Sequence, residues 1–179
     1  MVWLYSSFIL TDQRKYEEAF QYLRQSAGQL HELKQTLPTA SFLQLVLQEA
    51  LILYQNKRWR EALSALRPVR GLGKAIRHQA TYPLIRLFIV MIRFDLKDYE
   101  FLSYEIRSFE RELGQLSGAH KSELLVLKTI KKLINTANDK NASVLVSKNL
   151  EGLNKLWKNP NEQIRAKTID LDGWLNKLI

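Results

Sequence analysis

Hydrophobic residues recur with helical spacing along most of this 179-residue chain. In the run from Tyr16 to Leu37, apolar positions return every three or four residues, which places them on one face of a helix. Further runs of this kind follow, separated by short polar stretches. The pattern predicts four helical hairpins, at residues 1–37, 42–72, 82–113 and 122–157, and an amphipathic capping helix at residues 162–179.

Three of these hairpins place an aromatic residue directly after a short polar turn. The aromatic residues are Tyr16, Trp59 and Tyr99, so the spacings are 43 and 40 residues. A fourth polar turn is expected at residues 138–141. One helix pair in each period of 20–50 residues is typical of an α-solenoid. We therefore predict an all-α fold, a single right-handed α-α superhelix of about four hairpins that spans residues 1–179.

The aromatic residue is followed three positions later by alanine in two of the hairpins. The pairs are Tyr16 with Ala19 and Trp59 with Ala62, whereas Leu102 takes the alanine position after Tyr99. In these features residues 1–113 resemble the tetratricopeptide repeats. The period of 40–43 residues exceeds the 34 residues of that family, so the helices or the links between repeats are expected to be longer.

The turns depart from the family pattern at one position. The glycine that is usual there is replaced by Arg14, Lys57 and Lys97. The chain is therefore best described as a divergent tetratricopeptide-like solenoid.

The resemblance implies a protein–protein interaction scaffold that binds a peptide or a helix. In that family the partner lies in a groove lined by the first helix of each pair. The corresponding positions near the ends of those helices are Thr11, Asp12, Tyr54, Gln55, Phe94 and Asp95. Tyr54 and Phe94 are expected to be the main anchors, because aromatic side chains dominate such contacts.

The N-terminal stretch is apolar nearly all round, from Val2 to Leu10. A terminal repeat of a solenoid needs a polar outer face, and this stretch does not provide one. We therefore expect that the chain is the C-terminal part of a longer protein, and that this face is available for self-association. No run has the roughly 20 apolar residues that span a bilayer, and the N-terminal stretch lacks the basic residues and the small-residue cleavage site of a signal peptide. The expected location is the cytoplasm, without membrane association.

The charge raises an alternative function. The chain has 27 Lys and Arg against 18 Asp and Glu, a net charge of +9. Seven basic residues but only Glu61 fall between Asn56 and His78. Clustered Arg and Lys bind phosphates and release counterions, so this segment predicts a nucleic-acid-associated module. Its anion patch is expected to consist of Arg58, Arg67, Arg70, Lys74 and Arg77.

Residues with catalytic or metal-binding chemistry are sparse and widely spaced. Cysteine is absent. His31, His78 and His120 belong to different hairpins and are interpreted as surface or interhelical residues. Glu105 and Glu112 share a predicted helix with two arginines, and a solvated charged face is the interpretation. The sequence therefore predicts no catalytic residue, no cofactor-binding or metal site, and no enzyme.

Overall fold

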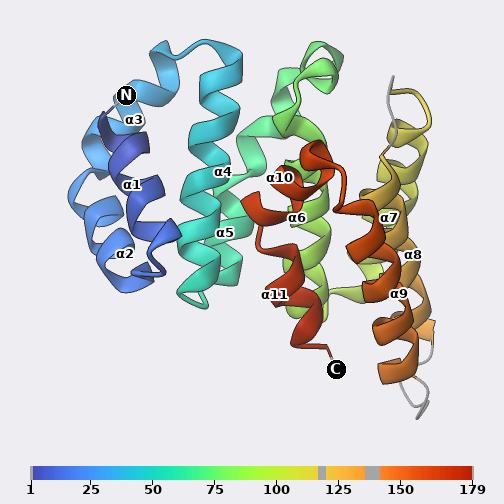
Figure 1. Ribbon diagram of the computed structural model, residues 1–179. Coiled ribbons are helices and arrows are strands. Elements are labelled where there is room, and N and C mark those ends of the chain that lie inside the picture. The colour runs from blue at the N-terminus through green and yellow to red at the C-terminus, as the bar shows by residue number, and fades with distance from the viewer. Residues whose placement is uncertain (1, 117–119, 136–141, 179) are drawn as a thin grey trace. The chain divides into compact units, whose positions relative to one another are not determined.

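The computed structural model describes residues 2–116, 120–135 and 142–178, which form helices joined by turns (Figure 1). These residues contain no β-strand, so the predicted all-α class is confirmed. None of their helices has both the length and the apolar character needed to cross a membrane. The chain separates into two compact units, residues 1–85 and 86–179, with the boundary inside α6 (Thr81–Asp95).

The first unit contains two helical hairpins and their connections. Its elements before α6 are α1 (Val2–Asp12), α2 (Tyr16–Gln25), α3 (Ala27–Thr36), α4 (Thr39–Gln55), α5 (Trp59–Ala65) and the 3-10 helices η1 (Arg67–Leu72) and η2 (Lys74–His78). The helices α1 and α2 pack together and both contact α4, which also packs along α5. Most side chains of α4 are therefore buried.

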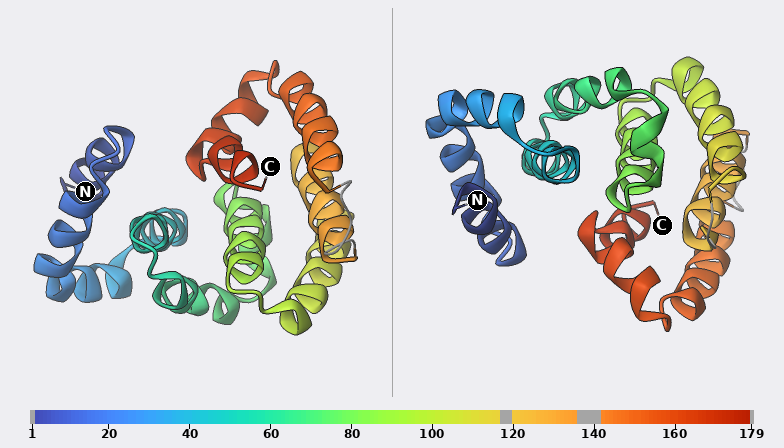
Figure 2. Two further views of the ribbon diagram at one scale, coloured as in Figure 1. Left: turned by 90° about the horizontal axis from the view of Figure 1, so that it is seen from below. Right: turned by 90° about the horizontal axis from the view of Figure 1, so that it is seen from above.

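The second unit begins with the C-terminal part of α6. It continues through α7 (Tyr99–Leu113), α8 (Lys121–Asn135), α9 (Ala142–Leu156), α10 (Pro160–Thr168) and α11 (Leu171–Asn176). The helix α8 packs between α7 and α9, and α11 contacts α9. Figure 2 shows α10 and α11, in red, returning from α9 toward α6.

Three hairpin turns share one backbone geometry. Arg14, Lys57 and Lys97 have φ angles of 58°, 59° and 57°, in the left-handed region. Each donates its N–H to the carbonyl three residues earlier, and the next residue donates to the carbonyl five residues earlier. This pair of bonds is the Schellman motif that ends helices. The periodic turns seen in the sequence are thus one structural element used three times, whereas the predicted turn at 138–141 lies outside the described residues.

Two of the runs predicted as single helices are interrupted. The run from residue 16 to 37 divides at Ser26 into α2 and α3. The second helix of the hairpin predicted at residues 42–72, which begins at Trp59, stops being α-helical after Ala65. Pro68 has no N–H to donate, and the chain continues as a 3-10 helix.

The predicted capping helix is also divided in two. Asn159 begins α10 by accepting a hydrogen bond from the Asn161 N–H at 3.0 Å, and Pro160 takes the first helical position. Asp170, with φ of 48°, then separates α10 from α11.

The additional helices account for the spacings of 43 and 40 residues between Tyr16, Trp59 and Tyr99. The helix α3 lies between the first two hairpins, and η1 and η2 lie between α5 and α6. The two 3-10 helices meet at Gly73, whose φ of 73° suits a residue without a side chain. Short helices therefore lie in the connections between the hairpins.

Polar contacts connect the two hairpins of the first unit. The amide of Asn56, in the second turn, donates to the backbone carbonyl of Tyr16 at 2.9 Å and to that of Ile52 at 2.8 Å. The amide of Gln48 on α4 donates to the Thr11 hydroxyl on α1 at 3.1 Å. These bonds hold the end of α1 and the start of α2 against α4.

Candidate protein-interaction surface

The inner side of α1 packs into the first unit. Trp3, Leu4 and Ser7 are buried there. The Trp3 ring stacks on Tyr22 of α2 with 6.3 Å between the ring centroids. This side of α1 therefore has the packing expected of a core helix.

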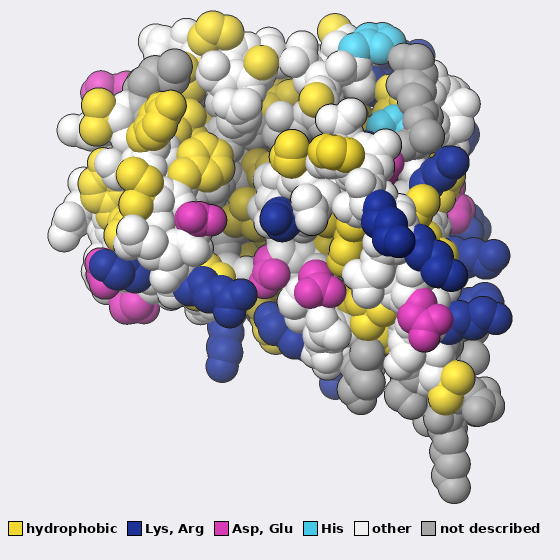
Figure 3. Space-filling model, viewed as in Figure 1, with side chains coloured by type: hydrophobic (Ala, Val, Ile, Leu, Met, Phe, Trp, Pro, Cys, Tyr) yellow, Lys and Arg dark blue, Asp and Glu magenta, His cyan; other side chains and the backbone are white. Residues whose placement is uncertain are grey.

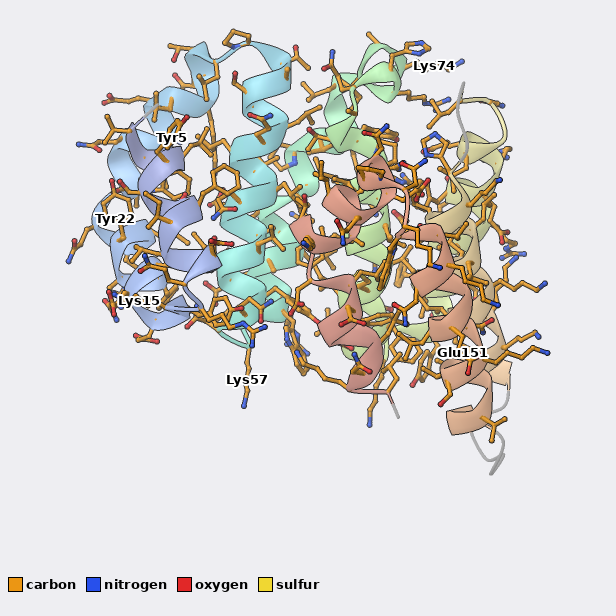
Figure 4. All side chains as sticks on the ribbon, viewed as in Figure 1. Tyr5, Lys15, Tyr22, Lys57, Lys74 and Glu151 are labelled. Atoms are coloured by element: carbon orange, nitrogen blue, oxygen red, sulfur yellow. The ribbon has the colours of Figure 1, made fainter. Side chains whose placement is uncertain are left out.

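The outer side of α1 is apolar but exposed. Val2, Tyr5 and Ile9, spaced at i, i+3 and i+7, are 77%, 73% and 53% exposed, and Phe8 beside them is 44% exposed. We call these four residues the α1 face. Figure 3 shows hydrophobic side chains gathered over this part of the first unit, and Figure 4 labels Tyr5 there. Contiguous apolar surface of this kind marks binding sites, because leaving it in water is unfavourable.

The helix α4 shows how the same unit covers a helix of this composition. Leu43 and Leu45 point to opposite sides of α4, and they are 0% and 1% exposed. The neighbours α1 and α2 cover one side of α4, and α5 covers another (Figure 1). A helix that is apolar all round is normally buried all round. The helix α1 is also apolar nearly all round, but within its unit only one side of it is covered.

The predicted groove positions of the first unit are the ends of α1 and α4. The Thr11 hydroxyl accepts the hydrogen bond from Gln48, Tyr54 is 6% exposed, and Gln55 is half-buried. Asp12 is exposed. Three of these four side chains are thus wholly or partly used in packing within the chain.

The predicted groove positions of the second unit contact the C-terminal helix. The Phe94 ring lies edge-on to Trp174 of α11, with 5.7 Å between centroids. The Trp174 indole N–H donates to both carboxylate oxygens of Asp95, at 3.2 Å each. The chain's own α11 therefore occupies Phe94 and Asp95, the positions expected to face a partner.

The predicted anion patch is divided along the second hairpin. Arg58 lies at the hairpin turn, where its Nε donates to Glu61 at 2.7 Å and its guanidinium lies 4.7 Å above the Phe20 ring. The other four arginine and lysine residues follow α5. Figure 4 shows Lys57, next to Arg58, at the turn of the α4–α5 hairpin, and Lys74 far from that turn, on η2.

The remaining basic residues lie close together in sequence on the two 3-10 helices. We call them the η1–η2 basic cluster: Arg67, Arg70, Lys74 and Arg77. Residues 67–78 contain no acidic residue, and Arg67, Arg70 and Lys74 are exposed. The cluster is therefore a positively charged surface of the first unit.

His120 is an interhelical residue, one of the two placements expected. It precedes α8, and its Nδ1 accepts a hydrogen bond from Arg165 Nη2 of α10 at 3.0 Å. Arg165 also pairs with Glu123, which is 2% exposed. Burial of the ring and the charge of Arg165 lower the pKa of His120, against a raising effect of Glu162. Within the described residues, no group of His, Asp and Glu has the arrangement of a metal site.

Glu105 and Glu112 correct one interpretation of the sequence. They do not lie on a solvated face of α7, because they are 4% and 8% exposed. Both approach Arg86 of α6, with nitrogen–oxygen distances of 3.8 and 3.6 Å, and Arg86 also lies 5.6 Å above the Phe109 ring. These acids therefore hold α7 against α6.

Sequence reasoning missed a second group of exposed aromatic residues, on α7. Phe101 and Tyr104 are 58% and 62% exposed and lie one helical turn apart. Arg93 lies 5.3 Å above the Phe101 ring. Charged residues, Glu100 and Glu105, flank this pair in the sequence. Hydrophobic periodicity alone did not separate the pair from the buried positions of α7.

No family model matches the chain, no curated protein matches it, and no solved structure matches it.

Proposed function

We propose that this protein is a non-catalytic protein–protein interaction module with tetratricopeptide-like hairpins. The observation that carries the proposal is the α1 face, a stripe of exposed apolar side chains on a helix whose other side is part of the core. The three equal Schellman turns support the repeat character of the hairpins.

The α1 face suits a helix as its partner. Val2, Tyr5 and Ile9 follow the i, i+3, i+7 spacing that one helix presents to another, and the large Tyr5 side chain lies in the middle of the stripe. We place the contact here and not in the predicted groove, because Tyr54 is buried and Phe94 packs on Trp174.

Site-specific photo-cross-linking tests this function. A photoreactive amino acid replaces Tyr5 in one variant and Tyr104, which is exposed to a similar degree, in the control. Both variants are irradiated in cells that express the full chain. We expect a discrete protein adduct from position 5 and none of that mass from position 104. Absence of an adduct at position 5, or the same adducts from both positions, would contradict the proposal.

A second candidate function rests on the η1–η2 basic cluster. We propose, as this second function, that an anionic polymer such as nucleic acid binds there, because Arg67 and Lys74 are exposed and no acid lies between residues 67 and 78. Arg58 is excluded from this site by its pairing with Glu61.

Fluorescence anisotropy with labelled random-sequence DNA and RNA tests this second function. Binding that persists at about 150 mM salt and is lost in Arg67→Gln/Lys74→Gln would support it. Arg58→Gln is the control and should bind like the parent. Binding that disappears near that salt concentration, or that all three chains share equally, would rule it out.

A further inference from the structure

We propose that the α1 face binds the α1 face of a second copy of this chain, which gives a two-fold symmetric dimer. This inference rests on the proposed function, because it names the partner of the surface on which that function depends. Two-fold interfaces use the same patch on both copies, so the patch must be complementary to itself.

The charge distribution favours a second copy as the partner. Residues 1–37 contain four bases (Arg14, Lys15, Arg24, Lys34) and four acids (Asp12, Glu17, Glu18, Glu32), so their net charge is zero. The other residues contain 23 bases and 14 acids, which is the whole +9. Because these residues carry the net positive charge, two copies on average repel each other when they approach through them, although residues 95–112 alone contain six acids and three bases. The segment that includes α1 is neutral and permits close approach.

The spacing along α1 favours an antiparallel arrangement. With a two-fold axis near Tyr5 and Ser6, Val2 of one copy lies opposite Ile9 of the other. No charged residue occurs from Val2 to Thr11, so no like charges meet along the contact. Ser6 is small and half-buried, so the two helices can approach closely at the axis.

Asp12 adds charge complementarity to this arrangement. It is exposed at the C-terminal end of α1, where the helix dipole disfavours a carboxylate. The first turn of α1 has no acidic residue to compensate its own positive end. An antiparallel second copy brings Asp12 of each chain toward the N-terminal end of the other α1. The carboxylate then lies near a positive helix end, and that helix end gains the negative charge that its own first turn lacks.

The exposed area is large enough for the centre of an interface. From their exposed fractions, the four side chains of the α1 face present on the order of 400 Å² per copy. A standard interface buries about 800 Å² per partner, with an apolar centre and a polar rim. The α1 face thus supplies about half of that area.

Light scattering and sedimentation of the full chain test the dimer. Over about 1–100 µM, the micromolar range of moderate-affinity contacts, we expect the mass to rise from 20.9 kDa toward twice that value. Tyr5→Glu should remain at 20.9 kDa, whereas Phe101→Glu, an exposed aromatic position on α7, should dimerise like the parent. Circular dichroism must show the same helicity in all three chains.

Cross-linking then tests the orientation, because the parent has no cysteine. Val2→Cys and Ile9→Cys alter exposed side chains and leave the core intact. An oxidised mixture of the two variants should form a mixed disulfide dimer in higher yield than either variant alone. Equal or higher yields from the separate variants would overturn the antiparallel arrangement.

Three further results would overturn the dimer: a parent chain that stays monomeric to about 100 µM, loss of association in both Tyr5→Glu and Phe101→Glu, or growth beyond two copies. A monomeric chain that still gives a discrete adduct with a different protein from position 5 would overturn the dimer and leave the proposed function standing. A monomer without any adduct would remove both.

Discussion

The indole N–H of Trp174 donates to both carboxylate oxygens of Asp95, a residue 79 positions earlier in the chain. Trp174 is 2% exposed, and Phe94 packs edge-on against its ring. This contact fastens the last helix of the second unit to the end of α6. It also means that two residues expected to bind a partner instead bind the chain itself.

Replacing Trp174 with Phe should destabilise the protein. The variant removes the donor to a charged acceptor and leaves space where the larger ring lay, so the free energy of unfolding should fall by about 2 kcal/mol. Urea unfolding followed by circular dichroism measures this change. Trp157→Phe is the control, because the buried Trp157 indole N–H donates no hydrogen bond. Equal losses in both variants would show that the Asp95 bond contributes nothing.

Replacing any of the three left-handed turn residues with glycine should stabilise the protein. A side chain costs about 1–2 kcal/mol in this conformation, so its removal stabilises the folded state. Glycine also has more conformational freedom in the unfolded chain, which offsets about 0.4–1 kcal/mol of this stabilisation. Lys57→Gly and Lys97→Gly should therefore each raise the free energy of unfolding by about 0.5–1 kcal/mol. Thermal and urea unfolding measure it.

A helical lysine provides the matched control for the glycine variants. Lys128 is exposed within α8, where glycine should instead cost about 1 kcal/mol. If Lys57→Gly and Lys97→Gly destabilise the protein as Lys128→Gly does, the left-handed turns are not strained.

Acid should weaken the packing of α10 on α8 through His120. Burial and the Arg165 charge lower its folded pKa below the ordinary value of 6.5, so the unfolded state binds the proton more readily. Neutral His120 makes its full contribution to the free energy of unfolding above pH 6.5. This contribution is lost as the pH falls toward the folded pKa and does not change further below it. The free energy of unfolding should therefore decrease from pH 7.5 to 5.5.

The variant His120→Gln should have a flatter dependence of stability on pH over this interval. Urea unfolding at several pH values gives the comparison, and His78→Gln, which alters an exposed histidine, serves as the control. If the stability of the parent chain is constant over the interval, or if His78→Gln flattens the pH dependence equally, His120 is not the source of the pH dependence.

Arg86 should be essential for the stability of the protein as long as Glu105 and Glu112 remain. Arg86→Met leaves Glu105 and Glu112 buried without the guanidinium, and breaking a buried ion pair in this way costs about 3–5 kcal/mol. Adding Glu105→Gln and Glu112→Gln to the same chain should recover part of that loss. The measurement is urea unfolding of both variants. A triple variant less stable than Arg86→Met would refute the ion-pair explanation.

The local features of the fold were predictable because they depend on neighbours in sequence. The aromatic residues Tyr16, Trp59 and Tyr99 begin their helices, and the turns before them have equal hydrogen bonds, since a Schellman motif is completed within six residues. The hairpin predicted at residues 82–113 corresponds to α6 and α7, and α7 ends at Leu113. The exposed positive segment after α5 was likewise visible as a run of Arg and Lys without acids.

The candidate site was only partly predictable. The sequence showed that the first helix is apolar all round, but not which side Trp3 would bury and which Tyr5 would expose. It placed Glu105 and Glu112 in solvent, because the Arg86 that pairs with them belongs to another helix. The residues of a single helix do not indicate which residue of another helix will pair with them.

By itself, then, the sequence determined the helical class, the places of the three described hairpin turns and the uneven distribution of charge, because periodicity, turn chemistry and charge are local properties of the chain. The tertiary structure decided which apolar and charged side chains were used internally. Trp174 reached Asp95 and Arg165 reached His120 because α10 and α11 packed back against α6 and α8. Burial depends on residues distant in sequence, so only the folded chain distinguished the covered groove positions from the open α1 face.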